Sequence, residues 1–195
     1  MFSSRPFILS STLLFALGLP WVCITARSQA ASSPDQKLNL NAVVVLDQEL
    51  CATKIKKNHE SFEVGKAACD IFKSALGLGF SRLTSAGTAS GAADAQAVLI
   101  PRFVDLSATK TMGAFSTREL TILLEWTVKD KTGRTVWIGT VQGTGKNHMG
   151  NGFTYKTDLR EIIHYALEDL AHKSVADMDS SPELNKFAQK VASTQ

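Results

Sequence analysis

The sequence predicts an α+β domain in which a small mixed or antiparallel sheet has helices packed on one face. Apolar residues alternate with polar ones over residues 120–129, and an extended segment follows a glycine-containing turn, which is typical of a β-hairpin. Residues 42–46 and 97–100 are short apolar runs that favour buried strands. Residues 62–80 and 159–171 instead repeat apolar residues at helical spacing, so helices and strands share one core.

The first half of the domain is expected to run from strand to helix to loop. The strand covers residues 40–46, which include a β-branched run too short for a helix. The helix covers residues 62–80, and Gly77 and Gly79 end its pattern. Residues 84–93 are small, polar or glycine, and they predict a mobile loop.

A strand and a hairpin are expected next. The strand covers residues 97–103, where Pro101 favours an edge or a strand end. The hairpin pairs residues 120–129 with residues 135–141 around the turn at 130–134. Its inward row is expected to consist of Leu120, Ile122, Leu124, Trp126 and Val128.

The chain is expected to end in two helices. Residues 143–157 are rich in glycine and asparagine and predict a loop, after which Asp158 is expected to cap a helix. The core face of that helix comprises Leu159, Ile162, Ile163, Ala166, Leu167, Leu170 and Ala171. A short helix over residues 182–191 follows, with Ser181 as its cap. The expected order is β-α-β-β-β-α plus this short C-terminal helix.

The first 30 residues have the pattern of a secretory leader. Arg5 lies in a short basic segment, residues 6–26 carry no charge, and residues 28–30 place small side chains where a signal peptidase cleaves. We therefore predict a signal peptide over residues 1–30. Two alternatives stay open, namely an uncleaved membrane anchor and lipidation at Cys23. Cleavage is favoured, because Pro20, Trp21 and Val22 precede Cys23 where a lipidation motif has small residues.

After the predicted signal peptide we expect a flexible lead-in over residues 31–39 and a single α/β domain over residues 40–195. All 18 acidic residues follow the leader, together with 19 of the 21 basic ones, so the exported part is nearly neutral. The only local basic run is Lys54, Lys56 and Lys57, which is expected to be a solvated turn. Binding to nucleic acid needs a clustered basic face, and we therefore expect none.

Two cysteines follow the leader, Cys51 and Cys69. An even count in an oxidising compartment favours a disulfide between them, which would stabilise the fold by about 3 kcal/mol. Cys69 lies on the flank of its helix's apolar face, within reach of Cys51. The alternative is a pair of buried free thiols. The sequence has no Cys-x-x-Cys motif, so it predicts neither a zinc ribbon nor a thioredoxin-type site.

No recognisable catalytic motif occurs in the chain. Residues 143–147 resemble a phosphate-binding loop, but Thr140 stands where its first glycine belongs and Asn147 where its Ser or Thr belongs. His164 and His172 are expected to be exposed on a helix surface. We therefore expect a protein that is not an enzyme and has no cofactor or metal. The alternative is an exported hydrolase that uses scattered polar residues such as Asp47, Asp105 and His148.

Two aromatic residues, Phe153 and Tyr155, lie in the glycine-rich segment before the long helix. Aromatic side chains on a loop can anchor a partner. The alternative is that they fold back onto the core. We expect Phe153 and Tyr155 to bind a protein partner, and the open edges of the sheet to serve as further contact surfaces.

The hairpin carries a resemblance to known families. Residues 128–137 resemble the Asp-x-x-Thr-Gly-x-x-x-Trp hairpin of bacterial periplasmic and outer-membrane lipoproteins, with one spacer residue fewer here. These include auxiliary lipoproteins of envelope transport systems and YajG-like, curli-export and exopolysaccharide-export accessory proteins. The resemblance implies a non-catalytic binding or assembly subunit that is periplasmic or associated with the outer membrane. It also implies a protein partner in the envelope and is compatible with a homo-oligomer.

Overall fold

The computed structural model describes residues 37–57, 60–92, 94–110, 117–148 and 155–194. Its elements in chain order are β1 (Leu38–Val45), α1 (Gln48–Cys51), β2 (Lys54–Lys57), β3 (Glu60–Glu63), α2 (Val64–Ala75), η1 (Leu76–Leu78), β4 (Phe80–Ala86), η2 (Ala89–Ala92), β5 (Ala97–Lys110), β6 (Thr117–Asp130), β7 (Thr135–His148), α3 (Tyr155–Ser180) and α4 (Pro182–Ala192). The predicted order β-α-β-β-β-α plus a C-terminal helix is present as β1, α2, β5, β6, β7, α3 and α4, and the structure adds α1, β2, β3 and β4 to it.

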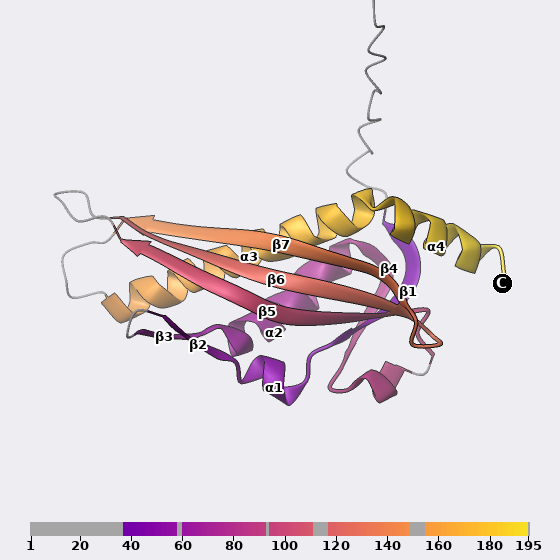
Figure 1. Ribbon diagram of the computed structural model, residues 1–195, viewed down its shortest axis with the longest axis horizontal. Helices are drawn as coiled ribbons and strands as arrows, with labels where there is room; N and C mark the ends of the chain where they lie inside the picture. The colour runs from indigo at the N-terminus through magenta and orange to yellow at the C-terminus, as the bar shows by residue number, and fades with distance from the viewer. Residues whose placement is uncertain (1–36, 58–59, 93, 111–116, 149–154, 195) are drawn as a thin grey trace, which may run out of the picture. The chain divides into compact units, whose positions relative to one another are not determined.

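The main sheet has five strands in the order β4-β1-β5-β6-β7 (Figure 1). β1 runs parallel to both of its neighbours, while β5, β6 and β7 form an antiparallel meander. β2 and β3 form a separate two-stranded antiparallel sheet. The parallel pair β1 and β4 is connected through α1, the small hairpin and α2, because parallel strands need a long crossover.

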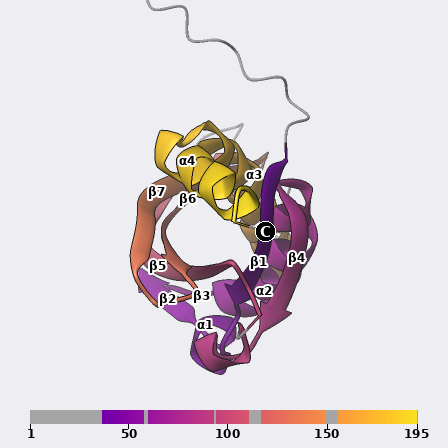
Figure 2. The same ribbon diagram turned by 90° about the vertical axis from the view of Figure 1, so that its right-hand side faces the viewer.

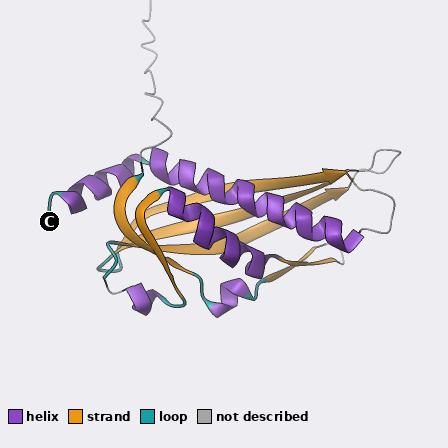
Figure 3. Ribbon diagram, turned by 180° about the vertical axis from the view of Figure 1, so that it is seen from behind, coloured by secondary structure: helices purple, strands orange, loops and turns teal. Residues whose placement is uncertain are grey.

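Helices α2 and α3 cover the same face of the five-stranded sheet, as Figure 3 shows from behind. Seen end-on in Figure 2, the sheet curves around this helical layer. The Phe72 ring of α2 lies 5.3 Å from the Trp126 ring of β6, which fixes the contact between helix and sheet. The mixed sheet with helices on one face confirms the predicted fold class.

The inward row of β6 forms the centre of the core. All five of its members are buried, and Trp126 is completely inaccessible to solvent. The Trp126 Nε1–H donates a hydrogen bond of 2.8 Å to Ser174 Oγ of α3, and that hydroxyl donates in turn to the Leu170 carbonyl at 2.7 Å. The ring is thus buried without leaving its polar atom unpaired.

Several predicted boundaries in the first half are wrong. The helix predicted over residues 62–80 is shorter at both ends, since Phe62 belongs to β3, α2 ends at Ala75 and Phe80 begins β4. The predicted loop over residues 84–93 starts with the last three residues of β4, because a backbone ladder with β1 does not require large side chains. β1 itself begins at Leu38, within the segment expected to be a flexible lead-in.

The lysine run is part of a hairpin and not a turn. Lys54 begins β2, and its ammonium group forms a 2.7 Å ion pair with Glu63 at the far end of β3. The short helix α1 and this two-stranded sheet were not predicted. Elements of four residues carry too little periodicity to stand out in a sequence.

In the second half the predicted elements are present but longer. β7 continues to His148 through residues predicted to be a loop, and α3 begins at Tyr155, so Asp158 lies inside the helix and not at its cap. The prediction that Pro101 marks an edge strand or a strand end is wrong, because β5 lies between β1 and β6 and continues to Lys110. Proline is compatible with this position because it follows Leu99, the last residue of β5 paired with β1. Ser181 caps α4 as predicted, since its hydroxyl oxygen accepts from the Leu184 N–H at 3.2 Å.

Across the described residues, no helix combines the length and the apolar character needed to span a bilayer.

Candidate functional site

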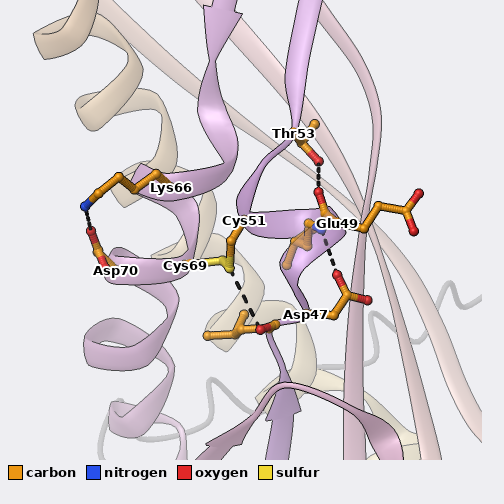
Figure 4. Close-up of a disulfide and its surroundings, with 9 residues drawn as sticks. Asp47, Glu49, Cys51, Thr53, Lys66, Cys69 and Asp70 are labelled. Atoms are coloured by element: carbon orange, nitrogen blue, oxygen red, sulfur yellow. Dashed lines mark hydrogen bonds and ion pairs between the residues drawn. A yellow bond between two sulfur atoms is a disulfide. The ribbon is translucent and has the colours of Figure 1, made fainter.

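A disulfide joins Cys51 at the end of α1 to Cys69 of α2, which is the pairing that the sequence favours (Figure 4). The two Cα atoms lie 5.7 Å apart. α1 also packs closely against α2, because a Cβ at Gly65 would overlap the Leu50 carbonyl oxygen. The bridge therefore ties the short helix and the start of the small hairpin to the core helix.

The predicted partner-binding aromatics cannot be located in full. Phe153 lies outside the described residues, and Tyr155 is the first residue of α3, with a side chain that is also outside the description. The proposed contact surface around Phe153 and Tyr155 therefore stays a prediction.

Two residues of the alternative hydrolase reading, Asp105 and His148, lie far apart along the sheet. Asp47 caps α1, since its Oδ1 accepts from the Leu50 N–H at 2.7 Å. Asp105 is aligned through Leu123 with Gln142 of β7, six residues before His148, and six residues of strand span about 20 Å. His164 and His172 are both exposed, as predicted. Among the described residues, no group of three or more His, Cys, Asp or Glu could hold a metal ion.

The turn between β6 and β7 is built by one carboxylate. Asp130 Oδ1 accepts hydrogen bonds from the Thr132 N–H at 2.9 Å, the Arg134 N–H at 3.1 Å and the Thr132 hydroxyl. Asp130 Oδ2 accepts from Arg134 Nε at 3.2 Å, and Gly133 takes a φ of 82°. The hydrogen bond from the Thr132 side chain is the main reason that the pKa of Asp130 lies below its usual value. The residues that carry the family resemblance thus have a structural function here.

Glycines line the face of β7 that packs on α3. A Cβ at Gly143 would overlap the Ala166 carbonyl oxygen and lie 2.6 Å from the Leu170 nitrogen. One at Gly145 would overlap the Ile162 carbonyl oxygen and lie 2.7 Å from the Ala166 nitrogen. The backbone of α3 therefore lies directly on β7, which only residues without a side chain permit.

Within the described parts of the chain β7 has only β6 as a neighbour in the sheet, so the opposite margin of β7 is an open edge. The Thr144 N–H donates a 2.8 Å hydrogen bond to Asp169 Oδ2 of α3, so it points away from β6. In an antiparallel ladder this direction alternates, and the register from Thr144 to Thr140 is unbroken. The backbone N–H and C=O groups of Thr140 and Gln142 therefore also point outward.

Asp169 covers one end of this edge. Partial burial opposes its ionisation, but hydrogen bonds from Lys173 and the Thr144 N–H outweigh that effect and hold its pKa below the usual value. Lys173 lies 2.7 Å from the same carboxylate oxygen. The carboxylate is thus ionised near neutral pH and accepts the hydrogen bond of the Thr144 N–H. Among the described residues, no side chain forms such a hydrogen bond with the backbone of Thr140 or Gln142.

A groove of 380 Å³ lies where the open edge meets α3. It is lined by Thr140, Val141, Gln142, Lys173, Ala176, Asp177 and Ser180. We call the outward backbone of Thr140–Gln142 together with this groove the β7 edge site. It combines free backbone hydrogen-bonding groups with a side-chain pocket, which is what an added strand requires.

Sequence reasoning did not single out the β7 edge site, although its predicted strand includes Thr140 and Val141, because it could not tell which strand lies at the margin of the sheet. It also ended this strand too early, because it assigned residues from Gly143 onward to a loop. A signal was present nevertheless. Gly139, Val141, Gly143 and Gly145 alternate strictly with polar residues, which is the period of a strand with one face covered. The small size of the inward residues hid that alternation from a search for hydrophobic periodicity.

Comparisons with known proteins find similarity in structure alone. No family model matches the chain, and no curated protein sequence matches it significantly. Protein XCC0632 from Xanthomonas campestris, of the family DUF330, aligns with a TM-score of 0.51 at 9% identity, covering 83% of this chain and 93% of that one.

Two other solved structures align less closely. A minor lipoprotein from Acinetobacter baumannii has a TM-score of 0.44 at 10% identity, covering 74% of this chain and 94% of its own. A PelC dodecamer from Paraburkholderia phytofirmans has a TM-score of 0.37 at 18% identity, covering 71% and 94%. The chain therefore shares the fold of XCC0632. The resemblance to envelope lipoproteins noted in the sequence, including the YajG-like assignment, stays a prediction.

Proposed function

We propose that this chain is a non-catalytic, exported subunit of a bacterial envelope transport, export or surface-assembly system. In this proposal it binds an extended segment of a partner protein by strand addition at the β7 edge site. The observation that carries the proposal is the outward backbone of Thr140 and Gln142, which no strand of the described chain pairs.

The flanking side chains suggest what the partner segment carries. Asp177 lines the groove next to the edge, and among the described residues its carboxylate has no ion-pair partner. The preceding acidic residue of α3, Asp169, is already paired with Lys173. A lysine or arginine of the added strand would pair with Asp177, and its alkyl chain would pack on Ala176.

Export supports the envelope location. The predicted leader would deliver the chain to an oxidising compartment, and a disulfide such as Cys51–Cys69 persists in such compartments. The fold shared with XCC0632, a bacterial protein, is compatible with this proposal, but a shared fold does not identify the transport or assembly system. A homo-oligomer through the same edge is compatible with this reading.

The test replaces one outward donor while leaving the fold intact. The partner is first identified by crosslinking in the native envelope and purified. Thr140→Pro then removes an outward N–H that makes no bond to β6, whereas Thr140→Ala changes the side chain and keeps that N–H. We expect Thr140→Pro to weaken partner binding by about tenfold or more and Thr140→Ala to bind as wild type.

Asp177→Asn provides an independent arm, because it removes the charge and keeps the side-chain volume. It is expected to weaken binding and to reduce the salt dependence of the affinity. Wild-type affinity in a folded Thr140→Pro variant would contradict strand addition at this edge.

A further inference from the structure

A second groove, of 590 Å³, is lined by residues of the β6–β7 turn and of α4. Its walls are residues 94–96, the turn Asp130–Arg134, and the side of α4 that carries Phe187, Lys190 and Val191. This volume is within the range of sites for small organic ligands. The groove shares no residue with the β7 edge site.

Each wall is held in place by its own contacts. The Gln96 N–H donates a 2.8 Å hydrogen bond to the Asn41 carbonyl of β1, and the Asn41 N–H donates one of 2.8 Å to Gln96 Oε1. The turn is fixed by Asp130, and α4 is fixed by its Ser181 cap and by buried Leu184. A groove with three anchored walls is preorganised, so a ligand would lose little affinity to ordering it.

The charges in the groove are predominantly positive. Arg134 is occupied by Asp130 at 3.2 Å. Lys131 and Lys190 also line the groove, and among the described residues neither ammonium group has an ion-pair or hydrogen-bond partner. Asp94 is the one remaining carboxylate of the lining, which leaves a net positive charge facing the groove.

The remaining lining is apolar. Phe187 and Val191 are half-buried on α4, and Ala95 is buried opposite them. A ligand that matches the groove must therefore carry an anionic group for the two ammonium groups and an apolar chain for this wall. A small inorganic anion would leave the apolar wall in water, and a neutral apolar molecule would leave the lysines without a partner.

We propose that this groove binds a monomeric amphiphilic anion, with a carboxylate or phosphate headgroup at Lys131 and Lys190 and an acyl or alkyl chain along Phe187 and Val191. The test uses decanoate and decyl phosphate as probes, below the concentrations at which they form micelles, and follows the backbone amide signals of the full exported chain by NMR. The two probes distinguish the two headgroup chemistries.

We expect saturable shifts at Ala95, Thr132 and Val191 with at least one probe. Lys131→Glu with Lys190→Glu should weaken that binding by about tenfold or more. The matched control, Lys73→Glu with Lys186→Glu, carries the same change in net charge on lysines outside the groove and should bind as wild type. Acetate and inorganic phosphate test the anionic group alone, and decyltrimethylammonium tests the chain with the opposite charge.

Three results would overturn the proposal. The first is no saturable shift with either anionic probe. The second is equal binding of decyltrimethylammonium, or of acetate or inorganic phosphate, because then either the charge or the chain contributes nothing. The third is equal weakening in the control variant, which would assign the effect to net charge and not to this groove.

Discussion

β6 and β7 are neighbours in one antiparallel ladder and are both 14 residues long, yet the side chains on their inward faces differ in size. β6 presents large apolar side chains that include Trp126, whereas β7 presents Gly139, Val141, Gly143 and Gly145. α3 fits this difference, because it packs against side chains on β6 and against bare backbone on β7. The side chains of β6 thus supply apolar burial, while β7 brings the helix to the margin of the sheet.

This difference in side-chain size determines what the edge can do. A large residue at position 143 would hold α3 away from β7, and Asp169 would no longer reach the Thr144 N–H. With glycine there, α3 closes one end of the edge and leaves Thr140 and Gln142 beside a groove. A strand with little apolar burial of its own can therefore form a defined interaction surface, supported by the strand next to it.

The largest expected effect is on β6. Trp126→Ala removes a completely buried ring and leaves Ser174 without its donor, and we expect a loss of about 3–5 kcal/mol in the free energy of unfolding. Thr127→Ala on the outward face of the same strand should cost less than about 0.5 kcal/mol. Urea unfolding measures both, and similar losses in the two variants would show that β6 is not the core strand.

Loss of the disulfide, which lies outside β6 and β7, gives a free-energy change with which the effects of the strand variants can be compared. Its two cysteines are 18 positions apart, so Cys51→Ser with Cys69→Ser should lower the free energy of unfolding by about 3 kcal/mol. The same shift of the urea midpoint should follow reduction of the wild-type protein with dithiothreitol. Alkylation of both cysteines without prior reduction would show that the bridge does not form.

On β7 the expected effect comes from added volume and not from lost volume. Gly143→Ala places a methyl group against the backbone of α3, and we expect a loss of about 1–3 kcal/mol. Gly77→Ala is the matched control, since nothing lies within 4 Å of its Cβ position. Thermal unfolding compares the two, and an unchanged midpoint for Gly143→Ala would mean that α3 does not lie directly on β7.

The turn that joins the two strands has the smallest effect, and it depends on pH. The pKa of Asp130 in the folded protein lies below the usual value of an aspartate, because the Thr132 side chain donates a hydrogen bond to its carboxylate. The ionised form therefore stabilises the fold at neutral pH, and this contribution is lost as pH falls through the folded pKa. Asp130→Asn should therefore be less stable than wild type at about pH 7, and the difference should shrink as the pH falls below about 4. A difference that does not change with pH would assign the effect to shape alone.

The same contrast explains how far the sequence predicts the structure. Leu120, Ile122 and Leu124 alternate with polar residues, so β6 was predicted almost in full, and the helix over residues 159–171 was found from its apolar face. β7 was cut short at Val141, because glycine is read as a loop signal when it is also compatible with close packing. A single sequence does not reveal which of these a glycine serves.

The β7 edge site was not predictable as a site for a related reason. The sequence analysis expected open sheet edges to be contact surfaces, but it could not order the strands. Which margin is open depends on β1 pairing between β4 and β5, a long-range contact without a local signal. The cysteine pairing was within reach because only two cysteines follow the leader.

Amide hydrogen exchange along β7 tests the central claim most directly. In the isolated protein, Thr140 and Gln142 should exchange rapidly, while Val141 and Gly143, which face β6, and Thr144, which donates to Asp169, should be protected. Addition of the purified partner should slow exchange at Thr140 and Gln142 selectively. Strong protection of Thr140 and Gln142 in the isolated monomer, or no change on binding, would contradict the account.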